Sequence, residues 1–406
     1  MQALVISLAM LAALLGAGCA TLDPRTPVPV ELVQDVRPLN MAGVRAWGDE
    51  VPGDIDAEFR TRLPNMPRLA QDAHRINGRP VVNILALSGG GSDGAFGAGL
   101  LTGWTERGDR PVFQVVTGVS AGAIIAPFAF LGSRYDSQLR EIWTDYGTNE
   151  LIVAQILPGL LGGPALADSG PLKALIEKYV TRSFLRQIAV EYRKGRMLLI
   201  GTTNLDAQRP VVWNMGEIAA SGHPRALELF REVILASASI PGALPPVNIT
   251  VDYGNKTFEE MHVDGGTTHE VFVSPLQVPF KAFDRFYDAP PIRRLYIVKN
   301  GKFDPEYKPV KEQTLPIAAR AIETLIKSQH KGDIYRIYRM AQDAGADFNL
   351  TFVPDSFTLK ATEAFDRRYQ AALFAEGIRM SESGRVWVKR PPDVPGRRPR
   401  LTADAR

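Results

Sequence analysis

The sequence has little cysteine, little excess charge and no long apolar segment. Only one of its 406 residues is a cysteine, so disulfide-rich scaffolds and cysteine-based zinc sites are excluded. The formal net charge is +3, from 47 Lys and Arg against 44 Asp and Glu, which gives no argument for nucleic-acid binding. Apolar residues make up 45% and charged residues 22%, as in ordinary globular proteins. These values exclude a disordered chain, a coiled coil and a protein with several transmembrane helices.

The apolar segment at the amino terminus, residues 4–15, is shorter than the about 20 residues that span a bilayer. It is typical of a signal-peptide core, and the small residues 16–18 follow it as at a cleavage site. The segment resembles a bacterial lipoprotein signal, in which Cys19 is lipidated and anchors the mature chain to a membrane, although no Lys or Arg precedes it. By the same resemblance, Ala20 favours the outer membrane. The alternative is ordinary cleavage with an unmodified cysteine.

Further along the chain, short apolar runs predict buried strands, at residues 81–87, 112–117, 197–203 and 295–298. Helical patterns alternate with them or follow them, at residues 172–180, 227–236, 316–344 and 365–379. This alternation predicts the α/β class with a mostly parallel, buried central sheet. The predicted organisation has four parts: a signal peptide (1–18), a tether with short packing helices (19–78), the main domain (79–385) and a disordered basic, proline-rich tail (386–406).

A glycine-rich segment, residues 88–99, follows the first predicted strand. Such a turn presents consecutive backbone N–H groups at a helix N-terminus, where they bind phosphate or a developing oxyanion. A dinucleotide site also needs an acidic residue at the end of the next strand, but that strand ends at Thr117 and Gly118. The Gly-Lys-Ser/Thr sequence of a P-loop is absent as well. These absences favour the oxyanion.

The sequence Gly-Val-Ser-Ala-Gly, residues 118–122, lies between the second predicted strand and the apolar stretch 123–131. G-x-S-x-G between a strand and a helix is typical of a nucleophile elbow. Gly118 and Gly122 flank Ser120 because the turn is sharp and a side chain there would meet the neighbouring strand or helix. The Ser120 hydroxyl would stand at the helix N-terminus, where the helix dipole favours negative charge. The alternative is a tight turn that contains a serine by chance.

A third segment ends a predicted strand with Asp264, Gly265 and Gly266. A serine hydroxyl needs a base near neutral pH, and both Asp264 and a histidine are candidates. His262 shares the strand face of Asp264, and His269 follows it as in the Ser…Asp…His order of α/β-hydrolases. The spacing leaves both a dyad and a triad open. The other histidines are His74, His223 and His330.

Taken in this order, the three segments resemble the patatin-like phospholipase family, which combines a glycine-rich loop, G-x-S-x-G and D-G-G/A. Further stretches resemble it as well, and the most distinctive of them is residues 236–246. The resemblance covers roughly residues 80–270. It implies a three-layer fold in which helices flank a mostly parallel sheet and the main domain is an acyl hydrolase.

The resemblance also implies the site. Ser120 is the nucleophile and Asp264 the base of a dyad without histidine. Asp93 departs from the family pattern, because many members carry Lys or Arg there, and we expect it to face solvent or cap the following helix. The oxyanion hole is formed by backbone amides of the glycine-rich loop, namely those of Gly89, Gly90 and Gly91, and the other motif glycines are Gly94, Gly118, Gly122, Gly265 and Gly266.

The expected activity is hydrolysis of fatty-acyl esters of membrane lipids through an acyl-enzyme, of the phospholipase A or lysophospholipase type. The expected setting is the bacterial cell envelope, and neither a metal nor a cofactor is needed. One alternative is a non-catalytic envelope lipoprotein that binds lipid or a partner protein on the same fold. A second is a thioesterase or acyltransferase with the same dyad.

We expect the mature chain to begin at a lipidated Cys19. Intact-mass measurement of protein from bacterial membranes should therefore exceed the mass of the cleaved polypeptide by that of the acyl groups. The Cys19→Ser variant should lose membrane association, because acyl chains supply the anchor. Finding an unmodified cysteine in membrane-bound wild-type protein would contradict the assignment.

Overall fold

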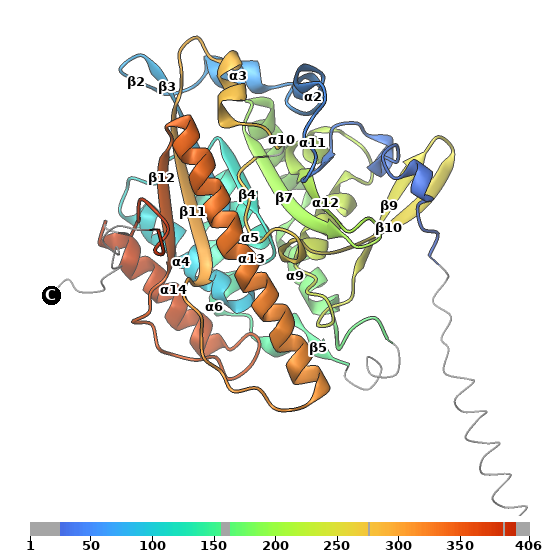
Figure 1. Ribbon diagram of the computed structural model, residues 1–406, viewed down its shortest axis with the longest axis vertical. Coiled ribbons are helices and arrows are strands. Elements are labelled where there is room, and N and C mark those ends of the chain that lie inside the picture. The colour runs from blue at the N-terminus through green and yellow to red at the C-terminus, as the bar shows by residue number, and fades with distance from the viewer. Residues whose placement is uncertain (1–24, 156–162, 275–276, 385, 395–406) are drawn as a thin grey trace, which may run out of the picture.

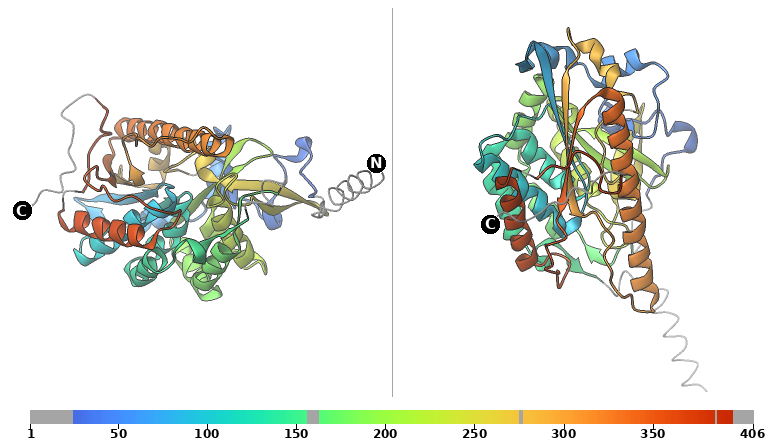
Figure 2. Two further views of the ribbon diagram at one scale, coloured as in Figure 1. Left: turned by 90° about the horizontal axis from the view of Figure 1, so that it is seen from below. Right: turned by 60° about the vertical axis from the view of Figure 1, so that its left-hand side comes forward.

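The computed structural model describes residues 25–155, 163–274, 277–384 and 386–394. The expected signal peptide, Cys19 and residues 395–406 of the expected tail lie outside these residues. Helices cover both faces of a central sheet, so the described chain has three layers (Figures 1 and 2). No helix in the described ranges is both long enough and apolar enough to cross a membrane.

The central sheet contains ten strands within the described residues. Seven of them follow one another in the order β1-β8-β7-β4-β3-β11-β12. Of the other three, β10 pairs with β7, β9 pairs with β10 and β2 pairs with β3. The five strands from β7 to β12 along this path are parallel, and the other pairings are antiparallel. Their bounds are β1 (Arg45–Trp47), β2 (Arg75–Ile76), β3 (Arg79–Leu87), β4 (Val115–Gly118), β7 (Met197–Asn204), β8 (Arg209–Asn214), β9 (Val247–Tyr253), β10 (Lys256–Asp264), β11 (Ile292–Lys302) and β12 (Asp347–Val353). A separate hairpin pairs β5 (Val153–Ala154) with β6 (Ala167–Asp168).

Two hydrophobic cores lie on opposite faces of the sheet, because successive strand residues point to opposite sides. Leu85 and Leu87 of β3 belong to one core, and Ile84 and Ala86 to the other. The larger core is covered by α4 (Gly94–Glu106), α5 (Ala121–Leu131), α6 (Asp136–Thr144), α7 (Thr148–Leu151), α9 (Gly170–Tyr179), α10 (Arg182–Arg193), α11 (Met215–Ala220), α12 (Ala226–Ser237) and α14 (Arg367–Glu382). The smaller core is covered by α2 (Ile55–Arg62), α3 (Met66–Gln71) and the long α13 (Thr314–Ala344), which runs across the face of the sheet in Figure 1.

The predicted α/β class and its four core strands are confirmed, although the second strand begins at Val115 rather than at residue 112. The helical pattern at 316–344 forms a single helix. The antiparallel strands β1, β2, β8 and β9 and the parallel β12 were not predicted, and β1 lies within the expected tether, paired with β8. The expected tail begins later than residue 386, because Val388 is 5% exposed and pairs with Leu350 of β12.

Glycines let α4 and α14 pack with their backbones in contact. A β-carbon on Gly99 would overlap the carbonyl oxygen of Phe374, and one on Gly103 would lie 2.8 Å from Cα of Ile378. From the other side, a β-carbon on Gly377 would overlap the carbonyl oxygen of Phe96. The two helices therefore tolerate no larger residue at these positions without moving apart.

Gly99→Ala should lower the free energy of unfolding by about 1–3 kcal/mol, as added atoms do in a well-packed core. Gly332→Ala is the matched control, since Gly332 lies in α13 and, within the described residues, no atom outside its chain neighbours and its own helix backbone lies within 4 Å of its β-carbon position. It should raise stability by about 0.5–1 kcal/mol, because alanine is the better helix former. Urea denaturation of both variants tests the packing, and equal effects would contradict it.

Candidate active site

One edge of β7 brings Ser120 and Asp264 together. β8 pairs with β7 from Leu199 to Asn204 along one edge, so β4 and β10 share the other. β4 reaches only as far as Gly118, which pairs with Ile200, because the chain then turns into the elbow. β10 takes over the freed edge with Asp264 opposite Thr202. Ser120 and Asp264 are thus neighbours although they lie far apart in sequence.

The turn at Ser120 is strained, with φ 53° and ψ −122° in a residue that is not glycine. This conformation is rarely populated and persists where surrounding structure enforces it, as at active sites. A β-carbon on Gly118 would overlap the carbonyl oxygen of Gly122, and one on Gly122 would overlap that of Leu87. The elbow therefore needs both glycines for steric reasons. Ser120 itself is 6% exposed and is the N-cap residue of α5.

Asp264 is a buried acid, 3% exposed, at the end of β10. Burial raises its pKa to about 7, while hydrogen bonding from Ser120 and from the Gly266 backbone opposes this rise. The Gly266 N–H donates to Oδ1 at 2.8 Å, and Oδ2 makes no hydrogen bond of ordinary geometry within the described residues. The contact with the serine is therefore looser than the Gly266 bond, as is common for catalytic groups without substrate.

The end of α12 and the residues after it fix the backbone of both Ser120 and Asp264. The Ser237 hydroxyl accepts from the Ser120 N–H at 3.0 Å and donates to the Gly201 carbonyl at 2.6 Å. Two residues later, the Ser239 carbonyl accepts from the Asp264 N–H at 2.9 Å. Residues 236–246 drew attention in the sequence, but their role as a brace for elbow and acid was not predicted.

The glycine-rich loop lies beside the serine with two backbone donors available. Within the described residues the N–H groups of Gly90 and Gly91 donate to no acceptor, whereas the Gly89 N–H donates to the Glu270 carbonyl at 3.3 Å. Asn300 of β11 holds this loop, since its side chain donates to the Ser88 carbonyl at 2.7 Å and accepts from the Gly97 N–H at 3.1 Å. Asn300 lies outside the sequence motifs and was missed.

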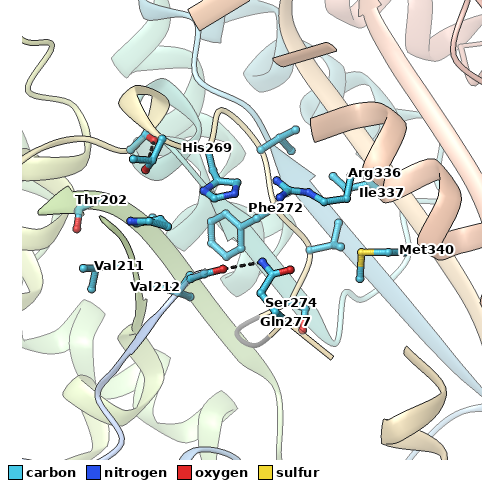
Figure 3. A pocket seen from close by; sticks show the side chains of 17 residues that line it. Thr202, Val211, Val212, His269, Phe272, Ser274, Gln277, Arg336, Ile337 and Met340 are labelled. Atoms are coloured by element: carbon cyan, nitrogen blue, oxygen red, sulfur yellow. Dashed lines mark hydrogen bonds between the residues drawn. The ribbon is translucent and has the colours of Figure 1, made fainter. Parts of the chain in front are cut away.

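The structure gives the two candidate histidines other partners. His262 is fully buried, with Nδ1 2.9 Å from the Thr202 hydroxyl and Nε2 3.2 Å from Glu260. His269 lines a cavity of about 40 Å³ on the α13 side of the sheet, where Figure 3 shows its ring close to Arg336. A space of this size holds water but no acyl chain. No histidine of the described chain donates to or accepts from Ser120 or Asp264 through a side chain.

The expectation for Asp93 is wrong. Asp93 is half-buried at the N-cap position of α4, where its side chain makes no capping bond, and its carboxyl instead accepts from the Tyr369 hydroxyl of α14 at 2.6 Å. Burial raises its pKa to about 6, with Tyr369 and the more distant Lys299 acting in the opposite direction. Because Tyr369 is remote in sequence, no local pattern indicated this pairing.

These observations define an α/β protein with a serine on a strained elbow, a buried acid beside it and a glycine-rich loop. A sequence profile of the family described as "Patatin-like phospholipase" matches residues 85–307, more than half of the chain. The chain therefore belongs to the patatin-like phospholipase family, which supports lipid ester hydrolase activity in general.

Two further comparisons add little to this. One solved structure with a match is that of VipD from Legionella pneumophila, at 11% identity and a TM-score of 0.33, covering 75% of this chain and 67% of that one. No curated protein matches.

Asp264→Asn should change the pH dependence of stability. Because the folded pKa of Asp264 is about 7, above the usual value near 3.9, protonation favours the fold and this contribution is lost as pH rises through 7. Asparagine carries no charge, so the variant should gain up to about 4 kcal/mol over wild type at pH 8 relative to pH 4. Denaturation at several pH values measures this difference, and a constant difference would contradict the burial of a charge.

Proposed function

We propose that the chain is a serine acyl hydrolase that cleaves fatty-acyl esters of membrane phospholipids through a Ser120–Asp264 dyad, as a phospholipase A or lysophospholipase. The observation that carries the proposal is the pairing, on one edge of β7, of a strained serine with a buried acid. Family membership supports the general class of reaction. In the described part of the chain, no histidine side chain is hydrogen-bonded to Ser120 or Asp264 in competition for the role of base.

In the proposed reaction the Ser120 hydroxyl attacks the ester carbonyl and passes its proton to the Asp264 carboxylate. Negative charge develops on the carbonyl oxygen, and the free N–H groups of Gly90 and Gly91 are suited to hold it. Removing one such donor typically costs about 2.7–4 kcal/mol of transition-state stabilisation. Asp264 then protonates the leaving alcohol, and in the second half it takes a proton from the water that hydrolyses the acyl-enzyme.

The pKa of Asp264 suits this role. An ordinary aspartate, with a pKa near 3.9, would be a weak base toward a serine hydroxyl. Burial raises the pKa of Asp264 to about 7, which brings its basicity near the operating pH while leaving much of it ionised. The same burial that destabilises the charged carboxylate thereby supplies driving force for proton transfer.

A lipid surface as the substrate is supported by exposed apolar side chains at the start of α13 and in the loop before it. Ile317 is 53% exposed and Leu325 68% exposed, and Tyr307 in the preceding loop is 90% exposed. Apolar groups of this kind insert at the boundary between headgroups and acyl chains. We place the protein at the bacterial cell envelope, anchored through Cys19, on the basis of its amino-terminal sequence alone.

Ser120→Ala and Asp264→Asn should each lower kcat toward a defined phospholipid by a factor on the order of 10³ or more, because nucleophile and base act as a unit. His269→Ala is the matched control, since its ring lies in the separate cavity, and it should keep appreciable activity. Product analysis by mass spectrometry, with circular dichroism to verify folding, gives the readout. Turnover retained in Ser120→Ala, or lost in a folded His269→Ala variant, would contradict the dyad.

A further inference from the structure

Glu270 brings a third carboxyl group to the site. It follows Asp264 by six residues and is 6% exposed. A β-carbon on Gly89 would lie 2.8 Å from Oε1 of Glu270 and 3.0 Å from Cβ of Ser120, so carboxyl and nucleophile flank the same glycine. A β-carbon on Gly266 would contact Oε2 of Glu270 and lie 3.1 Å from Oδ1 of Asp264. The Glu270 carboxyl therefore lies between the glycine-rich loop and the base.

The backbone holds Glu270 in this position from two sides. Its N–H donates to Oδ2 of Asp333, on α13, at 2.8 Å. Its carbonyl accepts from the Gly89 N–H at 3.3 Å, which connects it to the loop itself. The carboxyl oxygens, by contrast, make no hydrogen bond and no ion pair within 4 Å in the described part of the chain.

The charged groups around Glu270 come from β10, β11 and α13. Burial raises its pKa most, Lys299 on β11 opposes this rise, and Asp264 at the end of β10 and Asp333 on α13 add to it. Lys299 is itself buried, and desolvation lowers its pKa. On α13, Arg336 pairs with Asp333, and the buried His330 has no hydrogen-bond partner within the described residues. The neutral carboxylic acid is the form this environment favours.

We propose that Glu270 sets the charge of the oxyanion site, so that its neutral form permits the reaction and its ionised form suppresses it. The inference rests on the proposed hydrolysis, in which negative charge develops beside the glycine-rich loop. A second negative charge a few ångströms away, in a poorly solvated site, opposes that development. At an effective dielectric constant near 20, such a repulsion slows the reaction on the order of 10²-fold.

The test is the pH dependence of kcat/KM between pH 5 and 10 for wild type and Glu270→Gln, with a soluble short-chain ester. The kcat/KM of wild type should follow a bell-shaped curve. It should rise on the acid side as Asp264 ionises and fall on the alkaline side as Glu270 ionises. Glutamine resembles the neutral acid, so Glu270→Gln should keep the acid limb, lose the alkaline limb and stay within about threefold of wild type at its optimum. Glu363→Gln, at a solvent-exposed glutamate, should keep both limbs.

An unchanged alkaline limb in Glu270→Gln would overturn the proposal, and so would loss of activity at every pH in a folded variant. Melting temperature gives a readout that does not need turnover. A raised folded pKa means that ionisation favours unfolding, so wild type should lose more stability than Glu270→Gln as pH rises from 6 to 9. A wild type that hydrolyses no ester would refute the proposed function, whereas equal melting curves would refute the buried titration of Glu270.

Discussion

The site depends on the division of one strand edge. β7 is paired throughout on the side of β8, and on its other side the parallel β4 ends where the antiparallel β10 begins. The hydrogen-bonding register along β7 places Gly118 opposite Ile200 and Asp264 opposite Thr202, two residues further along the strand. The elbow strain, the two glycines and the Ser237 brace then determine where the serine hydroxyl stands relative to the acid.

Desolvation is the second constraint, and it acts on several acids at once. Asp264, Glu270 and Asp333 are all buried, and burial is the largest influence raising the pKa of each. For Glu270 the nearby charges of Asp264 and Asp333 raise the pKa further, because like charges in a poorly solvated site repel one another. The cost in stability at high pH is the counterpart of the raised pKa that suits Asp264 to the role of base we propose for it.

Much of the fold could be predicted from local pattern. Buried parallel strands are continuous apolar runs, so β3, β7 and the centre of β11 were found. The antiparallel strands are mixed in composition, and β9 is half exposed, so their sequences do not stand out. β1 is only three residues long and gains its stability from pairing with β8, a tertiary contact that no local window contains.

For the site, sequence identified the three motif segments but not the residues that act across elements. Ser237, Asn300 and Glu270 reach the site through contacts between distant parts of the chain, and Asp93 turns toward Tyr369 for the same reason. The spacing of residues in the sequence does not decide between aspartate and histidine as base. Nor does it show that the Gly89 N–H already donates to the Glu270 carbonyl. Both depend on which side chains the register brings within reach.

The central claim is that Asp264 takes the proton of Ser120, and the pH dependence of covalent labelling of Ser120 by a fluorophosphonate tests it most directly. The labelling rate of the wild-type protein should rise with pH around an apparent pKa near 7, and the Asp264→Asn variant should lose that rise. A rise of the same size and midpoint in both proteins would contradict the account.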